Sequence, residues 1–299
     1  MNFHLRENVS VAICAKSAGK YIGNCIKSLL DQTFNDFEII IVEDPPFDRT
    51  ETLIRNFADK RIKHQRNKNH LGLTRSRNEC LKLAKGDFIF FTDADCVVSK
   101  RWVEKGLCSF REEGCIGVEG RTCYVSEKYN LRYSDAHSYV ENKSGGQFMT
   151  CNMAYKKSAI ESIGGFDEKY VNAEDRDLAL RAMKVGKIRF NPEMVVYHQK
   201  TTRKPLPLRQ IGKNLKYSHP RVLLYKQSGD KPLSLWRIVN PLNLATALFP
   251  PILLTTLLFK FRLFKSKEDF NLLPYLYIDA VFERLQIWRT CAIERVFLI

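Results

Sequence analysis

Asp93 and Asp95 are the residues whose types and spacing point most directly to chemistry. They follow a strongly apolar segment, GDFIFFT, at residues 86–92. Two carboxylates two positions apart at the end of a strand could share one divalent cation, directly or through its water, and Mg²⁺ and Mn²⁺ prefer such oxygen ligands. A turn with two solvated acids has the same sequence, because aspartate favours turns. The pair alone leaves both interpretations open.

A second acidic motif, E-D-R-D-L, stands at residues 174–178. It opens a segment, 173–184, with the spacing expected of a helix. Acids in the first turn of a helix complement its macrodipole, which is the structural interpretation. A carboxylate at such a position could instead act as a general base.

Two further candidates also follow apolar segments. His198 ends residues 188–198, which we expect to form one or two short strands, and a single histidine there is either a hydrogen-bonded structural residue or a ligand. Glu43 and Asp44 follow the apolar segment 37–42. An aspartate at that place could accept from a nucleobase N–H or a ribose hydroxyl, or it could simply form a turn before Pro45.

Alternating strands and helices must position these residues. Short apolar, β-branched runs predict strands, and apolar residues at helical spacing predict helices. We expect strands at 9–15, 37–42, 61–67 and from 86 to the two aspartates, helices at 19–30, 48–57 (capped by Asp48), 74–84 and 173–184, and a strand followed by a helix at 153–163. Residues 97–150 show no clear pattern. The alternation predicts an α/β fold with a mostly parallel central sheet covered by helices on both faces. Such sheets bind ligands at the carboxyl ends of their strands, where these acids fall.

The composition limits the class of protein. The chain has 299 residues, 44% of them hydrophobic, and a net charge of +15, which excludes a disordered chain, a collagen-like fibre and a small disulfide-stapled protein. Nine cysteines without a C-x-x-C pair indicate neither a disulfide framework nor a zinc site. The first residues show no secretory signal. We therefore expect reduced thiols and a cytoplasmic protein.

The order of the motifs resembles that of the family-2 glycosyltransferases, which have the glycosyltransferase A-type fold of nucleotide-diphospho-sugar transferases. The resemblance covers about residues 9–200 and implies a catalytic domain over residues 1–200. The motifs read E-D-P-P-F-D-R-T at 43–50, N-H-L-G-L-T-R-S-R-N at 69–78, D-A-D at 93–95, G-G-F-D at 164–167, E-D-R-D-L at 174–178, and His198 after a strand.

This resemblance implies a role for each matched residue. Asp175 would be the base that deprotonates an acceptor hydroxyl, Asp95 would bind Mg²⁺ or Mn²⁺, and His198 would be a further ligand of the metal or the diphosphate. Asp44 would contact the nucleoside of the nucleotide-sugar donor, and Asp93 its ribose or the metal. The motifs add further residues expected to bind the donor: Ala15, Glu43, Arg75, Ala94 and Glu174.

The chain departs from the family pattern at several positions. Cys14-Ala15-Lys16 stands where the first strand usually ends in Pro-Thr, Glu43 replaces the leading aspartate, and Pro46 replaces a serine. These departures bear on the nucleotide contacts, so the base is not specified. The Q-x-x-R-W motif of processive synthases is absent, since the first tryptophan after His198 is Trp236. We expect a single sugar transfer, with inversion implied by the resemblance alone.

Residues 201–299 have a different composition, with 16 basic and 6 acidic residues. Residues 238–259 carry no charge and are long enough to cross a bilayer, but three prolines interrupt them and basic residues flank both sides. We expect a mainly helical region with a re-entrant or interfacial hairpin and an amphipathic helix at 274–299 on an anionic membrane surface. A buried hairpin or an oligomer contact is the alternative. Membrane contact would place the chain at the cytoplasmic face of the cell membrane, near a glycan or lipid-linked acceptor.

Three other functions are weighed against this one. A sugar nucleotidyltransferase has a similar sheet, but it needs a glycine-rich basic loop after the first strand, and KSAGKYIG at 16–23 is poor in glycine. A basic module that binds nucleic acid or membrane would fit the charge, but no nucleic-acid-binding motif occurs, so we expect no nucleic-acid partner. An inactive transferase-like module would fit the Pro45-Pro46 departure.

Overall fold

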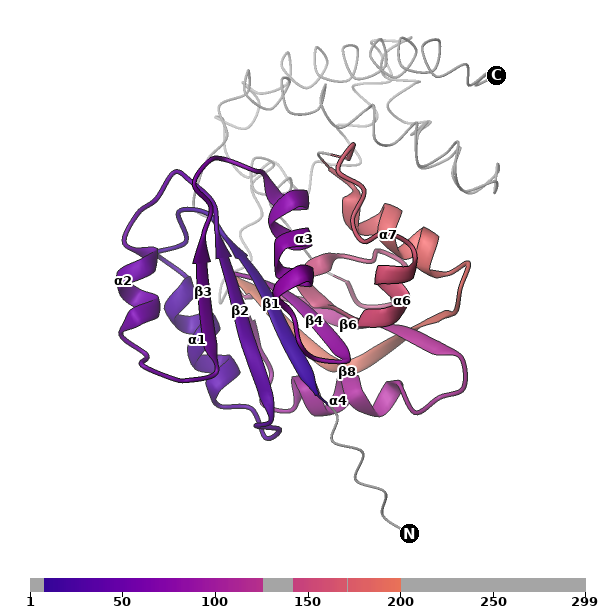
Figure 1. Ribbon diagram of the computed structural model, residues 1–299. Helices are drawn as coiled ribbons and strands as arrows, with labels where there is room; N and C mark the ends of the chain where they lie inside the picture. The colour runs from indigo at the N-terminus through magenta and orange to yellow at the C-terminus, as the bar shows by residue number, and fades with distance from the viewer. Residues whose placement is uncertain (1–7, 126–141, 171, 200–299) are drawn as a thin grey trace, which may run out of the picture. The chain divides into compact units, whose positions relative to one another are not determined.

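The computed structural model describes residues 8–125, 142–170 and 172–199 (Figure 1). All of them belong to one compact unit of the chain. The basic region at 201–299 lies outside the described residues, so the domain boundary at residue 200, the apolar segment and the amphipathic tail stay predictions. Among the helices that the structure describes, none is both long and apolar enough to cross a membrane.

A mixed sheet forms the centre of this unit. Its order within the described residues is β3-β2-β1-β4-β7-β6-β8-β5. The first half is parallel: β1 pairs with β2 and β4, and β2 pairs with β3. In the second half β7 runs antiparallel between β4 and β6, β6 is parallel to β8, and β5 is antiparallel to β8. The strands are β1 (Val9–Ala15), β2 (Phe37–Glu43), β3 (Ile62–Arg66), β4 (Phe88–Asp93), β5 (Cys96–Val98), β6 (Cys115–Val125), β7 (Met153–Lys156) and β8 (Lys187–Gln199).

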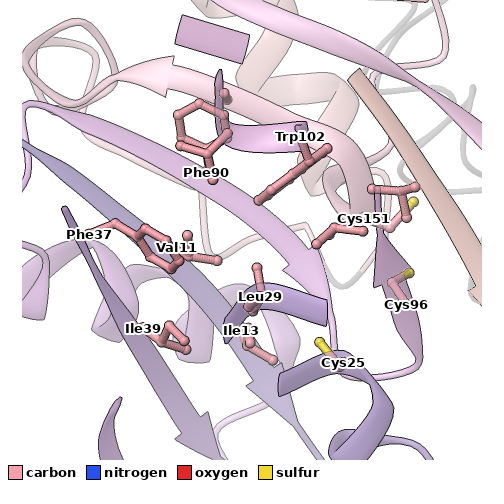
Figure 2. Close-up of a cluster of buried hydrophobic side chains, with 14 of the residues drawn as sticks. Val11, Ile13, Cys25, Leu29, Phe37, Ile39, Phe90, Cys96, Trp102 and Cys151 are labelled. Carbon is pink, nitrogen blue, oxygen red and sulfur yellow. The ribbon is translucent and has the colours of Figure 1, made fainter. Parts of the chain in front are cut away.

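Helices cover both faces of the sheet, because the buried side chains of the strands alternate between two apolar cores. Val11 and Ile13 of β1 pack with the helices α1 (Ile22–Leu30), α2 (Thr50–Arg55) and α4 (Trp102–Ser109). Ala12 of β1 packs on the other face with α3 (Leu73–Leu83), α6 (Lys157–Ser162) and α7 (Glu174–Ala182). Figure 2 shows the first core, where Leu29 and Trp102 lie among the strand residues.

The predicted α/β class with its mostly parallel sheet is confirmed, and each predicted element is present with small shifts at its ends. The second helix begins at Thr50, later than expected. Its N-cap residue is Arg49, so the predicted cap at Asp48 is wrong by one position. Asp48 still accepts the N–H group of Thr50 at 2.9 Å, and also that of Gly19, outside this helix, at 3.0 Å. Residues 188–198 belong to one long strand, and the segment 97–150, which showed no pattern, contains the last two residues of β5 and all of α4 and β6.

Candidate active site

The acids that follow β2 and β4 lie at one edge of the sheet. In the parallel register Ala15 is opposite Glu43, and Cys14 is opposite Asp93. The Asp44 N–H also donates to the Ala15 carbonyl oxygen at 2.8 Å, which extends the pairing beyond the strand ends. The expected convergence of residues from distant parts of the sequence at the carboxyl ends of the strands is therefore present.

Asp93, Asp95, Cys96 and His198 form the candidate metal centre. Each offers one ligand atom, and these atoms all lie within 4.8 Å of one another. The short strand β5 explains why His198 belongs to this group: Cys96 is opposite His198 in the antiparallel pair, and the Gln199 N–H donates to the Asp95 carbonyl oxygen at 2.8 Å. The Nε2 atom of His198 lies 3.5 Å from Oδ1 of Asp95.

The chemistry of this donor set fits a hard divalent cation. Burial raises the pKa of Asp95, His198 opposes that shift, and the neighbouring Asp93 adds to it, so a cation here would relieve repulsion between two carboxylates. A hydrogen bond with Cys151 and burial raise the pKa of Cys96, which keeps this thiol protonated. Two carboxylates and one imidazole remain as ligands, a set that suits Mg²⁺ or Mn²⁺.

The acidic start of α7 forms the second part of the site. Ala173, with a φ of 61°, precedes the helix, and Glu174 is buried. The Arg176 N–H donates to Asp175 Oδ1 at 2.8 Å, and the Thr150 N–H is a second donor to this carboxylate. Burial raises the pKa of Asp175, whereas the positive charge of Arg77 opposes the shift. A carboxylate held in this way can accept a proton at a fixed position.

Arg77 joins the two parts of the candidate site, and the sequence analysis missed it. It is only 5% exposed, its Nη1 atom contacts Glu174 Oε1, and its Nη2 atom lies 3.6 Å from Asp93 Oδ1. Arg75, which was predicted to bind the donor, is about half exposed, and its Nε atom pairs with Glu168 Oε2 at 2.8 Å. The signal for Arg77 was present, because the pair R77-N78 occupies the R-N position of the family motif at 69–78.

Glu43 is placed on the side of the sheet edge that faces β3. It is fully buried, and its Oε2 atom lies 3.0 Å from His64 Nε2 and 3.3 Å from Arg66 Nε. Burial raises the pKa of Glu43, whereas His64 and Arg66 oppose that shift. Its contact with the donor therefore stays a prediction. Ala15 and Ala94, also predicted to bind the donor, are buried as well.

Asp44 anchors the loop that leads into α3. Its carboxylate accepts the N–H groups of Leu71 at 2.9 Å and Gly72 at 3.1 Å, and the amide of Asn67 at 3.1 Å. His70 contacts the remaining position on Oδ2. Burial opposes ionisation, but these donors together hold the pKa of Asp44 below its ordinary value. Asp44 is thus a buried, ionised acceptor, and the half-exposed His70 is one of its partners.

The G-G-F-D turn fixes α7 relative to α3. Gly164 and Gly165 have φ angles of 83° and 68°, which glycine adopts without strain. Asn78 of α3 exchanges two hydrogen bonds of 2.9 Å with the backbone of Phe166, and Arg181 of α7 donates to the Gly165 carbonyl oxygen at 2.8 Å. The turn therefore holds the helices that carry Arg77 and Asp175.

Glu119 is a second residue that the sequence analysis did not identify. This carboxylate on β6 is 2% exposed and accepts the N–H groups of Gly146 at 2.6 Å, Gln147 at 2.9 Å and Phe148 at 2.6 Å, as well as the amide of Asn142 at 2.7 Å. It shapes the loop that leads to Thr150, the residue whose N–H faces Asp175. Its partners are mostly backbone groups, which no side-chain pattern reveals.

The model of the family described as "Glycosyl transferase family 2" matches residues 10–164, more than half of the chain. The chain belongs to this family. The match spans the strands β2 and β4, which end at Glu43 and Asp93, and it stops in the turn before α7. The resemblance inferred from the motifs is therefore confirmed.

Relatives match parts of the family-2 chain. An uncharacterized glycosyltransferase of Haemophilus influenzae is 37% identical over 99 residues, which cover 32% of this chain and 31% of that protein. The Escherichia coli protein WfaP, named UDP-Glc:alpha-D-GlcNAc-diphosphoundecaprenol beta-1,3-glucosyltransferase, is 28% identical over 185 residues, which cover 60% of this chain and 72% of WfaP. For three curated relatives the chain spans only 31% to 44% of their length.

A solved structure shows the fold. The mannosyltransferase PcManGT of Pyrobaculum calidifontis, in complex with GDP-Man and Mn²⁺, matches with a TM-score of 0.63 at 14% identity. The match covers 94% of this chain and 86% of that one. This confirms the expected glycosyltransferase A-type fold for the family-2 chain.

Proposed function

We propose that the protein is a metal-dependent glycosyltransferase that moves one sugar from a nucleotide-diphosphate sugar to a hydroxyl group of an acceptor. The observation that carries this proposal is the cluster of Asp93, Asp95 and His198 at the carboxyl ends of the strands, which Arg77 links to the acidic start of α7. Membership of the family supports the same reaction.

Asp93, Asp95 and His198 would hold Mg²⁺ or Mn²⁺. A bound cation would supply positive charge to the diphosphate oxygens of the donor, where negative charge develops as the sugar leaves. The mixed set of two carboxylates and one imidazole supports this role, and the Mn²⁺ named with the PcManGT structure agrees with it.

Asp175 would be the general base. The acceptor oxygen forms a bond to the anomeric carbon, its proton passes to Asp175, and the bond from that carbon to the diphosphate oxygen breaks with its electron pair. A single displacement of this kind inverts the configuration at the anomeric carbon. The N–H groups of Arg176 and Thr150 orient the Asp175 carboxylate for this transfer.

The donor would be held mainly by residues at the ends of the first two parallel strands. Asp44 would contact the nucleoside from its ionised carboxylate, and His70, whose side chain is 57% exposed, would move aside or join that contact. Ala15, Glu43, Arg75, Ala94 and Glu174 stay proposed donor-binding residues.

For the acceptor we propose a glycan, and more narrowly a lipid-linked saccharide. The name of WfaP, which specifies a diphosphoundecaprenol-linked sugar, supports this choice, as do the basic residues and the uncharged segment within 201–299. The same features support association with the anionic cytoplasmic face of a membrane. The test is sedimentation of the full-length chain with anionic and with neutral vesicles; a chain that stays in the supernatant with both at low salt contradicts membrane association.

Thermal unfolding tests the donor site. The midpoint is measured with UDP, GDP, dTDP and CMP, each with and without Mn²⁺, because a ligand that binds only the folded state must raise it. We expect one nucleotide to raise the midpoint only with Mn²⁺, and Asp95→Ala to abolish the rise. Asp87→Ala, at the exposed opposite end of the β4 segment, is the matched control. If no nucleotide raises the midpoint of the wild type, the transferase proposal fails and an inactive module is the better description.

A further inference from the structure

Arg77 connects two parts of the site that are far apart in the sequence, the end of β4 and the start of α7. Its Nη1 atom contacts Glu174 at the start of α7, and its Nη2 atom lies 3.6 Å from Asp93 at the end of β4. The guanidinium is planar and its N–H donors have fixed directions, so one side chain can contact both carboxylates at the same time. At 5% exposure it does so out of contact with bulk water.

The position of Arg77 is set by its neighbours and leaves the guanidinium little freedom to withdraw. The next residue, Asn78, is held by two hydrogen bonds to the backbone of Phe166. The guanidinium itself lies 5.8 Å from the centre of the Phe166 ring. Arg77 is therefore held by the same turn that holds α7. Its guanidinium, which contacts both Glu174 and Asp93, connects these two carboxylates rigidly.

The charge balance around Arg77 is uneven. The charge of Arg77 acts on three carboxylates, those of Asp93, Glu174 and Asp175, and Arg176 acts on Asp175 as well. Burial raises the pKa of Glu174 and of Asp175, and Arg77 opposes the shift in both. Among the described residues, the titratable and charged groups that face Asp175 are Arg77 on α3, Glu174 and Arg176 on α7, and Tyr155 on β7.

We propose that Arg77 is a positioning residue that interacts with both Asp93 of the cation site and the acidic start of α7. Through these two interactions it couples cation binding at Asp93 to the protonation state of Asp175. This inference rests on the proposed function for the roles of Asp93 and Asp175. Arg77 competes with a cation for Asp93. Once a cation binds Asp93, the guanidinium interacts only with Glu174 and Asp175. This favours the ionised form of Asp175, the proposed base, when the donor site is filled.

The first test measures Mn²⁺ binding alone, from the electron paramagnetic resonance signal of free Mn²⁺. Removing Arg77 by itself would leave Glu174 buried without a partner, so the double variant Arg77→Gln/Glu174→Gln is compared with Glu174→Gln. Because a positive charge next to Asp93 is lost, we expect the double variant to bind Mn²⁺ about three- to tenfold more tightly. A purely structural Arg77 gives equal or weaker binding, which would overturn the inference.

The second test measures the pH dependence of kcat/KM. In the double variant we expect the acidic limb to move upward by about one pH unit relative to Glu174→Gln, because Asp175 loses the positive charge of Arg77, which lowers its pKa in the wild type. Arg77→Lys keeps the positive charge, so its acidic limb should show only a small part of the upward shift seen in the double variant. Arg181→Lys is the matched control, since Arg181 pairs with buried Asp177 on the same helix. This control should leave the limb in place, whatever its effect on the unfolding midpoint.

The two tests separate this inference from the proposed function. A wild type that transfers no sugar refutes the function, while the Mn²⁺ comparison still tests the competition at Asp93. An active wild type whose variants keep both the Mn²⁺ affinity and the acidic limb of Glu174→Gln refutes the role of Arg77 and leaves the function intact.

Discussion

Cys96 of β5 lies opposite His198 of β8, and this pairing brings His198 Nε2 to within 3.5 Å of Asp95 Oδ1. The three residues of β5 directly follow the D-A-D motif, so the pairing joins the motif to a histidine from the last described strand. Backbone hydrogen bonds, rather than a free loop, hold the candidate ligands together. The cation site is therefore largely preformed by the sheet.

His198→Ala should weaken Mn²⁺ binding by at least about tenfold, because one of three candidate ligands is lost; even outer-shell partners of a metal ligand contribute 10- to 100-fold. Calorimetric titration with Mn²⁺ measures the effect. Tyr197→Ala is the control, since Tyr197 is the adjacent residue, is 40% exposed and points to the other face of the strand. Equal Mn²⁺ affinities of the two variants would remove His198 from the ligand set.

Asp175→Asn should lower kcat by about 10²- to 10⁴-fold and leave the affinity for the nucleoside diphosphate within about twofold. The amide keeps the shape of the side chain but cannot take up the proton. Steady-state kinetics and equilibrium binding separate the two effects. Asp167→Asn, which changes an acid of the G-G-F-D turn that pairs with Lys169, is the control. A kcat within tenfold of the wild type would assign the base elsewhere.

The acidic limb of kcat/KM should lie above pH 4. A general base must be ionised, burial raises the pKa of Asp175 above the ordinary aspartate value of about 3.9, and activity is lost as the pH falls through the raised value. Initial rates from pH 3 to pH 8 test this, with circular dichroism to show that the protein stays folded. A limb below pH 4, or an unchanged limb in Asp175→Asn, speaks against this assignment.

Glu119→Ala should lower the free energy of unfolding by about 2–4 kcal/mol, because three backbone N–H groups and one amide lose a buried acceptor. Urea denaturation measures the change. Glu112→Ala is the control: its ion pair with Arg189 is exposed and should contribute less than about 1 kcal/mol. If both variants are equally stable, Glu119 does not hold the loop at residues 146–148.

The first half of the fold could be predicted because its elements are regular. Strands such as β1 and β4 are continuous apolar runs, and α1 has apolar residues at helical spacing. The spacing of the apolar residues therefore predicts each element. Residues 97–150 gave no such signal. There β5 has three residues, and β6 shifts register between Cys115 and Gly117 and between Gly120 and Arg121. Their conformation depends on β7 and β8, which come later in the chain.

The candidate site could be predicted where a motif names the residue, as for Asp95 and His198, which the structure brings together. Which arginine of the motif at 69–78 lies next to the carboxylates of the site, Arg75 or Arg77, depended on which face of α3 is buried. Arg77 shares its face with Cys80 and Leu81, three and four positions later, and that spacing was readable. Glu119 could not be found in this way, because its partners are backbone groups of a loop.

The position of β8 also has a consequence for biosynthesis. A nascent chain that has emerged only as far as α7 contains the D-A-D motif and Asp175, but not the strand that pairs with β5. Until residues 196–199 leave the ribosome, β5 has no partner and the motif lacks its histidine. The candidate metal centre is thus the last part of the described chain to be completed during translation.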